Sequence, residues 1–251
     1  MQQDNNPSDI VTENLAKSFG TQKVLSGFNL KVARGDTVAV LGRSGTGKSV
    51  LLKLLIGLQR PDAGCIQIQG QEITTLDAKP LNEIRKKVGF LFQQGALYDS
   101  LTVEENVEFP LRRHTTLSAE EQKNRARELL RSVGMDRDAE KMPSQISGGM
   151  QKRVGIARAL ALDPAIVLLD EPTAGLDPIT AAEIGELISH LQQKHKTTSL
   201  VVTHDLLGAK RFSNRLLMLD QGKVLFEGGF ADLQHSKDPF VIRYLKDAGE
   251  G

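Results

Sequence analysis

The spacing of apolar residues predicts alternating strands and helices over much of the chain. Short apolar runs at residues 36–42, 165–170 and 199–203 are typical of buried strands. Helical apolar spacing follows these runs at residues 48–58, 178–194 and from about 205 onward. This alternation favours an α/β fold with a parallel sheet that is covered on both faces.

Other patterns add to this core. Residues 10–40 read as short strands separated by turns, and residues 215–228 read as a hairpin. Residues 94–162 are mainly helical, with a capping box from Ser118 to Glu121. We therefore predict one domain over residues 10–246 with a helical subdomain at about 94–162. A polar tail at 1–9 and a short C-terminal helical segment at 229–251, interrupted by Pro239, complete the chain.

Composition limits the class of protein. The net charge of +1 argues against a general electrostatic grip on nucleic acid, and the single cysteine excludes an internal disulfide framework. No apolar run approaches the roughly 18 residues of a membrane span. The first residues also lack the pattern of a signal peptide. We expect a chain that is cytosolic or that lies on a membrane only through another protein.

A phosphate-binding loop is the strongest chemical signal. "GRSGTGKS" at residues 42–49 follows a predicted strand and opens a predicted helix. Its backbone amides suit a triphosphate, Lys48 reaches the same oxygens, and the Ser49 hydroxyl is a ligand for Mg²⁺. A glycine-rich turn without a ligand is the alternative, but the flanking strand and helix favour the phosphate loop.

Three polar residues or pairs follow other predicted strands. In "AIVLLDEP", Asp170 suits magnesium and Glu171 suits the polarisation of an attacking water; the alternative is a solvated turn. His204 ends the run 199–205, where it would sense the γ-phosphate or orient that water, unless it is only structural. Gln93 follows the strand-like run from residue 88 and would reach magnesium or the water.

Two further positions raise questions. Phe19, before a turn at Gly20, suits stacking on adenine, with core packing as the alternative. Ser147 precedes a second predicted helix, and a helix N-terminus attracts anions. A nucleotide site with two helix starts so far apart in sequence needs an explanation.

In combination and in order, the motifs resemble the ATPase subunit of ATP-binding cassette (ABC) transporters. These motifs are "GRSGTGKS", "FQQ", "ISGGM", "LLDEP", "AGLDP" and "VTHD". The resemblance implies a RecA-like parallel-sheet core, an N-terminal antiparallel β-subdomain, a helical subdomain insertion, and ATP with Mg²⁺. It also implies a head-to-tail homodimer, in which the helix start at Ser147 binds the γ-phosphate held by the partner. Two chains would then share each nucleotide.

The resemblance and the residue chemistry together assign a set of site residues. The expected catalytic residues are Glu171, His204, Lys48 and Gln93, and the expected magnesium ligands are Ser49, Gln93 and Asp170. The expected nucleotide-binding residues are Phe19, Gly42, Arg43, Ser44, Gly45, Thr46, Gly47, Lys48, Ser49, the residue at position 50 (Val50), Ser147, Gly148, Gly149 and Asp177.

The signature motif departs from the usual Leu-Ser-Gly-Gly-Gln, with Ile146 and Met150 at its ends. These departures, with "AGLDPIT" and residues 91–115, look most like the ATPases of MCE-protein lipid transporters, and of the Mla phospholipid system within them. That likeness implies phospholipid transport at the cytoplasmic face of the inner membrane. Its partners would be an integral membrane permease, an MCE-domain lipid-binding protein and a small STAS-type accessory subunit, without nucleic acid.

Two alternatives remain open. The same ATPase could serve a transporter for another solute. A soluble ABC ATPase of DNA repair or translation is the other alternative, but the single cassette and the absence of sustained heptads disfavour it.

Overall fold

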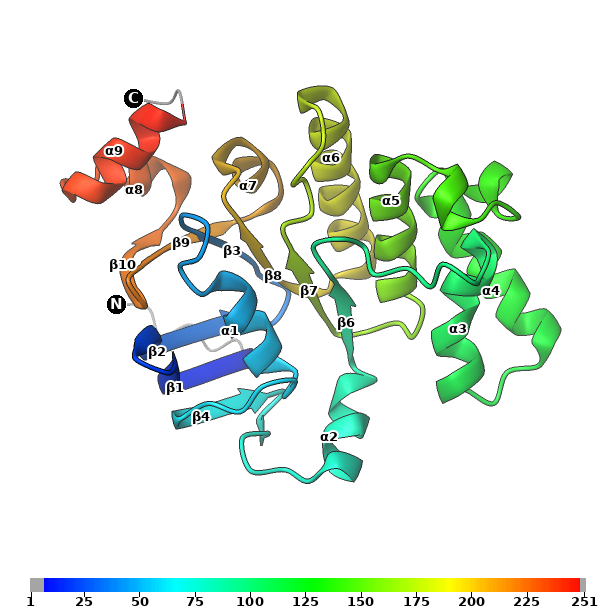
Figure 1. The fold of residues 1–251 in the computed structure, drawn as a ribbon, viewed down its shortest axis with the longest axis horizontal. Coiled ribbons are helices and arrows are strands. Elements are labelled where there is room, and N and C mark those ends of the chain that lie inside the picture. Colours follow the sequence, from blue (N-terminus) through cyan, green and yellow to red (C-terminus); the bar gives the residue numbers. More distant parts are fainter. Residues whose placement is uncertain (1–6, 249–251) are drawn as a thin grey trace.

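The computed structural model describes residues 7–248, and a six-stranded sheet forms its centre (Figure 1). The strand order is β10-β9-β3-β8-β7-β6. Neighbouring strands from β9 to β6 are parallel, and β10 adds to β9 as an antiparallel hairpin. The strands are β3 (Thr37–Leu41), β6 (Val88–Leu91), β7 (Ile166–Asp170), β8 (Thr198–Thr203), β9 (Arg215–Asp220) and β10 (Lys223–Gly228).

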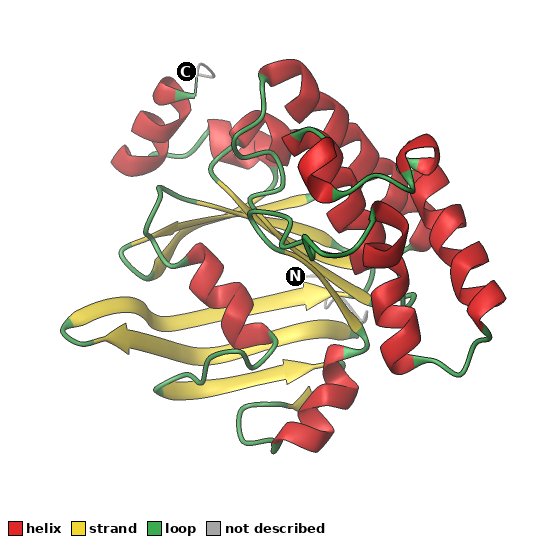
Figure 2. Cartoon of the chain, turned by 45° about the vertical axis from the view of Figure 1, so that its right-hand side comes forward, coloured by secondary structure: helices red, strands yellow, loops and turns green. Residues whose placement is uncertain are grey.

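A second, antiparallel sheet lies beside the first, and Figure 2 shows the two sheets together. Its order is β2-β1-β4-β5. The strands are β1 (Ser8–Phe19), β2 (Gln22–Ala33), β4 (Ala63–Ile68) and β5 (Gln71–Glu72). β1 begins at Ser8, inside the polar tail that was predicted at residues 1–9. Asp9 in this strand is only 1% exposed and accepts a hydrogen bond from Thr198, so this part of the predicted tail is packed against the domain. Residues 1–6 of that predicted tail lie outside the described part.

Alternation along the parallel strands divides the interior into two cores. In β7, Ile166 and Leu168 face the core that contains α1 (Lys48–Leu55), α2 (Ala78–Arg85) and the antiparallel sheet. Val167 and Leu169 face the opposite core, to which α5 (Gly148–Ala159), α6 (Pro178–His195) and α7 (Leu206–Phe212) contribute. The parallel sheet is therefore covered on both faces, as the strand and helix alternation predicted.

Between β6 and β7 the chain forms a group of helices, on the right in Figure 1. They are α3 (Val103–His114), α4 (Ala119–Ser132), the short 3-10 helices at Asp136–Asp138 and Pro143–Gln145, and α5. The predicted capping box at Ser118 and Glu121 is confirmed at the start of α4. A second box, between Thr102 and Glu105, starts α3.

The C-terminal segment differs from the single interrupted helix that the sequence predicted. It contains two helices, α8 (Phe230–Gln234) and α9 (Pro239–Asp247). Asp238 caps α9 through hydrogen bonds from Phe240 N and Val241 N, and Pro239 is its first residue. Proline suits this position because a first helical residue has no intrahelical partner for its N–H. No helix within residues 7–248 is both long and apolar enough to span a bilayer.

Candidate nucleotide site

The phosphate loop connects β3 to α1, and its glycines set its shape. Gly45 and Gly47 have φ of 82° and 100°, in the left-handed region that favours glycine. A Cβ at Gly47 would also lie 2.6 Å from Val24 Cγ1. Glycine at position 47 thus satisfies a backbone requirement and a packing requirement at once, and α1 begins at the next residue.

Lys48, the first residue of α1, is held inside this loop. Its side chain is 5% exposed, and Nζ donates to Gly42 O at 2.7 Å and Arg43 O at 3.0 Å. Nζ also lies 3.5 Å from Glu171 Oε1. Burial lowers the pKa of Lys48, while the nearby carboxylates of Glu171 and Asp170 oppose that shift. The loop therefore orients a buried ammonium group toward the end of β7.

A hydroxyl and a carboxylate meet where β7 ends. Ser49 Oγ donates to Asp170 Oδ1 at 2.8 Å, and Asp170 is 4% exposed. Burial raises the pKa of Asp170, and the hydrogen bond from Ser49 partly offsets that rise. Two hard oxygen donors from different elements are thereby placed side by side.

Glu171 and His204 form a second pair beside the first. His204 Nδ1 lies 2.9 Å from Glu171 Oε2, and His204 N donates to the same oxygen at 3.2 Å. Glu171 has φ of 47°, a conformation that costs a non-glycine residue about 1 to 3 kcal/mol. Tertiary contacts must offset that cost, and a carboxylate held this way is fixed in orientation.

A cavity of about 250 Å³ lies against these groups. Both Phe19 and Gln93 line it, as the sequence predicted for a nucleotide site. Phe19 is 46% exposed, which excludes the alternative of core packing. The lining residues are Phe19, Val24, Ser44, Gly45, Gly47, Lys48, Ser49, Val50, Gln93 and Glu171.

Several predicted residues do not line this cavity but are linked to residues that do. Gly42, Arg43 and Thr46 belong to the loop, where Thr46 Oγ1 donates to Arg43 O at 2.9 Å. The Arg43 guanidinium carbon lies 5.3 Å from the ring centroid of Phe240 in α9. Asp170 and His204 contact Ser49 and Glu171, which do line the cavity.

The second helix start is separate from this cavity. Ser147 caps α5 by accepting a hydrogen bond from Met150 N, and both Ser147 and Gly148 are exposed. A Cβ at Gly149 would lie 2.6 Å from Thr180 Cγ2, so the start of α5 packs closely on the start of α6. Neither Ser147, Gly148 nor Gly149 lines the cavity.

Asp177 caps α6 beside this surface. Its carboxylate accepts hydrogen bonds from Ile179 N at 3.1 Å, Thr180 N at 3.0 Å and Thr180 Oγ1 at 2.6 Å. The bond from the Thr180 hydroxyl is the main reason why the pKa of Asp177 lies below its usual value. Asp177 also lies outside the cavity.

The family model described as "ABC transporter" matches residues 25–174. The chain belongs to the ABC transporter family. The probable ribonucleotide transport ATP-binding protein mkl of Mycobacterium leprae (strain TN) is 42% identical over 236 residues, which are 94% of this chain and 68% of that protein. The methionine import ATP-binding protein MetN of Brucella abortus (strain 2308) is 40% identical over 86% of this chain and 58% of its own length.

A solved structure supports the same assignment. The ATP-binding cassette MJ0796, in a dimeric post-hydrolysis state bound to ADP and Pi, is 38% identical with a TM-score of 0.81. The match covers 88% of this chain and 98% of that one. The predicted ABC ATPase fold is confirmed, and the chain is an ATPase of this family that binds ATP with Mg²⁺.

The residues present in this ABC ATPase fit that ligand. Within residues 7–248 no group of three or more His, Cys, Asp or Glu side chains could hold a metal. Magnesium is commonly bound by one or two carboxylates together with substrate phosphates. The paired oxygens of Ser49 and Asp170, next to a loop lined by Lys48, match that mode of binding.

Two contacts of the ABC ATPase site escaped the sequence analysis. Lys152 in α5 is 5% exposed and donates to Glu171 O at 3.0 Å. Tyr244 in α9 donates its hydroxyl to His204 O at 2.7 Å. No local signal marks Lys152, because a lysine on a helix is normally solvated. Tyr244 lies in the segment that the sequence predicted only as a C-terminal helix, and a helical pattern does not show what the helix contacts.

Proposed function

We propose that two copies of this ATPase bind two MgATP head to tail and drive a separate membrane permease. One observation carries the proposal. The cavity beside Lys48 and Glu171 is open, while the exposed helix start at Ser147 lies outside it in the same chain. A second copy, placed head to tail, would bring Ser147 to the phosphates. The dimeric state named for the similar cassette MJ0796 supports this arrangement.

Within this proposal each residue has a role. Lys48 and the amides of residues 44–49 bind the phosphates, and Phe19 stacks on adenine. Ser49, Asp170 and Gln93 hold the magnesium, which neutralises phosphate charge when bound. In the partner-facing part, Ser147, Gly148 and Gly149 bind the γ-phosphate in trans, and Asp177 steadies the interface.

Glu171 is the proposed general base. It accepts a proton from the water that attacks the γ-phosphorus, and the bond to the ADP oxygen breaks in line. His204 contacts the same carboxylate oxygen at 2.9 Å and would orient both the base and the water. Lys48, 3.5 Å from the other oxygen, supplies positive charge where negative charge develops.

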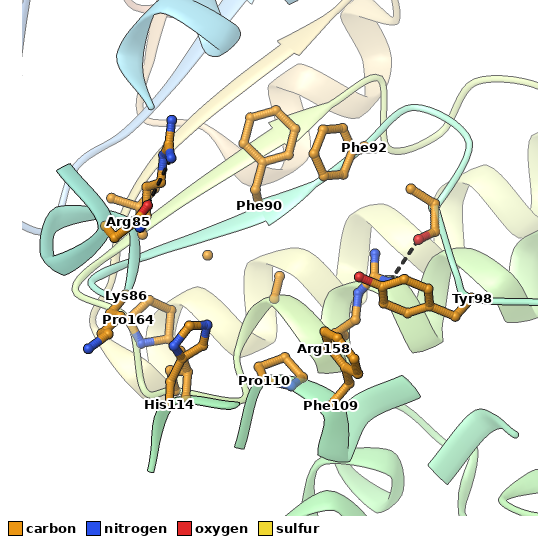
Figure 3. A pocket seen from close by; sticks show the side chains of 16 residues that line it. Arg85, Lys86, Phe90, Phe92, Tyr98, Phe109, Pro110, His114, Arg158 and Pro164 are labelled. Atoms are coloured by element: carbon orange, nitrogen blue, oxygen red, sulfur yellow. Dashed lines mark hydrogen bonds between the residues drawn. The ribbon is translucent and has the colours of Figure 1, made fainter. Parts of the chain in front are cut away.

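A larger cavity, of about 550 Å³, is the proposed docking groove for the permease (Figure 3). Aromatic pairs form its apolar walls: the Phe90 and Phe92 ring centroids are 4.2 Å apart, and those of Tyr98 and Phe109 are 4.6 Å apart. Tyr98 is 46% exposed. Strand β6 lines the groove, and so does the loop after it, with Phe92 on one side of Gln93 in sequence and Ala96 on the other. Because Gln93 itself lines the nucleotide cavity, a docked segment would contact the loop that connects the two cavities.

The charge of the groove indicates what docks in it. Arg85, Lys86, His114 and Arg158 line it, and none of its lining residues is Asp or Glu. A short permease helix with an apolar residue for the aromatic walls and a carboxylate for this basic rim would be complementary. We propose such a helix as the occupant.

For the transported substrate we propose phospholipid, with an MCE-domain protein and a STAS-type subunit as further partners, at the cytoplasmic face of the inner membrane. The support is the motif likeness, above all Ile146 and Met150 in the signature. The similar proteins are named for ribonucleotide transport and for methionine import, two unrelated solutes. A transporter for a non-lipid solute is therefore the second candidate.

The test is capture of the tagged full chain from its native membranes in mild detergent, with mass spectrometry of proteins and lipids. A multi-span permease, an MCE-domain protein and enriched phospholipid would support the lipid proposal. A permease with another solute-binding protein, and no enriched lipid, would overturn it while leaving the ATPase in place.

Two variants test whether the captured permease binds at the proposed groove. Tyr98→Arg adds a cation to the basic groove and should abolish capture of the permease. Leu225→Arg is the matched control, because Leu225 is 38% exposed and lies on β10, at the opposite edge of the central sheet from β6. If Tyr98→Arg captures the permease as well as Leu225→Arg does, the permease docks elsewhere.

A further inference from the structure

Lys152 is a buried cation that the proposed chemistry does not use. It lies in α5 and is 5% exposed, although lysine side chains are almost never fully buried without a partner. Its Nζ donates to Glu171 O at 3.0 Å and also to Gln93 O. Both acceptors are backbone carbonyls, so Lys152 contacts the chain itself at these two residues.

These carbonyls belong to the two segments closest to the proposed chemistry. Gln93 comes shortly after β6, and Glu171 directly follows β7, the strand that pairs with β6. On the other side, Glu171 N donates to Val202 O of β8 at 2.8 Å. The backbone of Glu171 is thus held from β8 and from α5, which accounts for the persistence of its left-handed conformation.

The same face of α5 holds the loop that follows Gln93. Arg158 donates to Gly95 O at 2.7 Å and Ala96 O at 2.8 Å. Between these cations, Gly155 allows close approach, because a Cβ there would lie 2.6 Å from Leu91 Cδ1. Residues 152, 155 and 158 are three apart and form one helical face. Helix α5 therefore donates hydrogen bonds to both ends of loop 93–96, from Lys152 at Gln93 and from Arg158 at Gly95 and Ala96.

We propose that Lys152 is a positioning residue for ATP hydrolysis. Lys152 links the carbonyl of Gln93 to that of Glu171. Loop 93–96, which lies at the docking groove, and the proposed base therefore move as one unit. A displacement of the loop at the docking groove then reaches the carboxylate of Glu171 through Lys152. This inference rests on the proposed role of Glu171 as the base.

The two hydrogen bonds of Lys152 support a positioning role over a role in filling space alone. A neutral apolar residue would fill the same space without the cost of burying a charge, and that burial lowers the pKa of Lys152. The nearby carboxylates of Asp170 and Glu171 favour the charged form. The ammonium group can donate to two carbonyls at once, which a methionine of similar length cannot.

The experiment compares Lys152→Met with Arg153→Met in the full chain. Arg153 is the next residue of α5, and it donates to Val133 O and to Glu183, away from the nucleotide cavity. Steady-state ATPase rates give kcat and KM, and thermal melting reports stability. Lys152→Met should lower kcat about tenfold to a hundredfold, as misplaced catalytic groups do. Its KM for ATP should stay within about twofold.

The control separates positioning from a general loss of structure. Arg153→Met should lower Tm by a similar amount and leave kcat within about twofold. If both variants lose the same kcat, or neither does, the positioning role is wrong. Should Lys152→Met fail to fold, Lys152→Gln replaces it in the comparison; its neutral amide has two N–H donors on a side chain one bond shorter, so a smaller loss of kcat is expected, still with Arg153→Met unchanged.

A double variant distinguishes this inference from the proposed base itself. If Lys152 acts through Glu171, adding Lys152→Met to Glu171→Gln should cause no further loss of kcat. An independent loss of the same size in both backgrounds would overturn the inference. If Glu171→Gln alone hydrolyses ATP at the wild-type rate, the proposed base is wrong, whatever Lys152 does.

Discussion

At the scale of single residues, Glu171 is the most constrained group of the site. Its carboxylate lies between the ammonium of Lys48 and the imidazole of His204, and the residue is 7% exposed. Its backbone is in the left-handed region, directly after a strand. The contacts of the side chain and the conformation of the backbone together fix the orientation of this carboxylate. A fixed orientation suits a base that must accept a proton from one water in one direction.

Glu171→Gln should lower kcat by about a hundredfold or more, because it removes the group that accepts the proton. ATP binding should persist, since the phosphate loop is unchanged, and the closed dimer should last longer. Single-turnover hydrolysis and nucleotide titration measure the two effects. Glu120→Gln, at an exposed position in the first turn of α4, is the control and should hydrolyse ATP normally. Wild-type turnover by Glu171→Gln would show that another group is the base.

The lowered pKa of Asp177 predicts that its contribution to the free energy of unfolding depends on pH. Its pKa in the folded chain is lowered, chiefly by the Thr180 hydroxyl, relative to the ordinary value of 3.8. Its stabilising contribution is therefore fully present above the ordinary value and is lost as the pH falls through the lowered one. Urea midpoints of the wild type and Asp177→Ala should differ at neutral pH and converge in that acid range. A difference that stays constant with pH would mean that the capping hydrogen bonds do not depend on the charge.

At the scale of elements, helix starts and ends place the chemistry. The phosphate loop precedes α1, Ser147 caps α5, Asp177 caps α6, and α9 supports the loop of His204. Apolar anchors hold α9 in place, since Val241 is 0% and Leu245 is 5% exposed. Its aromatic residues are then free to contact the site, with Phe240 near Arg43 and Tyr244 at His204 O.

Tyr244→Phe tests how firmly α9 is attached to the site. The change removes the bond to His204 O and keeps the ring, and burial raises the pKa of Tyr244, so the hydroxyl is protonated at neutral pH. We expect a loss of about 1 kcal/mol in the free energy of unfolding. Urea unfolding at neutral pH measures it. Unchanged stability would indicate that water replaces the hydroxyl at no cost.

At the scale of the whole molecule, the two helix starts proposed to bind phosphate lie at different surfaces. The start of α1 lines the nucleotide cavity, and the start of α5 lies outside it, packed on α6. Within the described residues of one chain, Ser147 does not line that chain's own cavity. In the proposed head-to-tail pair, each cavity would receive a helix start from the other copy. Nucleotide contacts made only in the dimer would stabilise closure by population shift.

Ser147→Arg should stop turnover and leave the nucleotide affinity of a single chain unchanged. The added cation and bulk fall on the partner's site and not on the chain's own cavity. Turnover and the binding of a fluorescent nucleotide at low protein concentration report the two quantities. Loss of affinity in the monomer would contradict the trans role.

Mixing two inactive variants extends this prediction. A mixed dimer of Ser147→Arg and Lys48→Ala contains one site with both residues intact and one with neither. Turnover should therefore reappear on mixing, at up to half of the wild-type rate for each mixed dimer and so at up to about a quarter for a random equimolar mixture, in which half of the dimers are mixed. Mixed dimers that bind ATP at the intact site but show no turnover would mean that one complete site is insufficient.

Much of the fold was predictable because its signals are local. Short apolar runs identified the buried strands, the capping box identified the start of α4, and the glycine pattern identified the phosphate loop before its helix. The division at α9 was also local, since Asp238 followed by Pro239 is the pattern of a cap and first helical residue. Pro239, which we predicted as an interruption of one helix, is instead the first residue of α9 after the cap at Asp238.

The sequence by itself determined which groups of the right chemistry stand at strand ends and helix starts, because backbone geometry there depends on neighbouring residues. Tertiary structure alone decided how those groups meet. It placed Phe19 at the cavity and not in the core, paired Glu171 with His204, and buried Lys152 against two carbonyls. Burial and pairing depend on residues distant in the chain, and a single lysine or glutamate carries no local sign of what will pack over it.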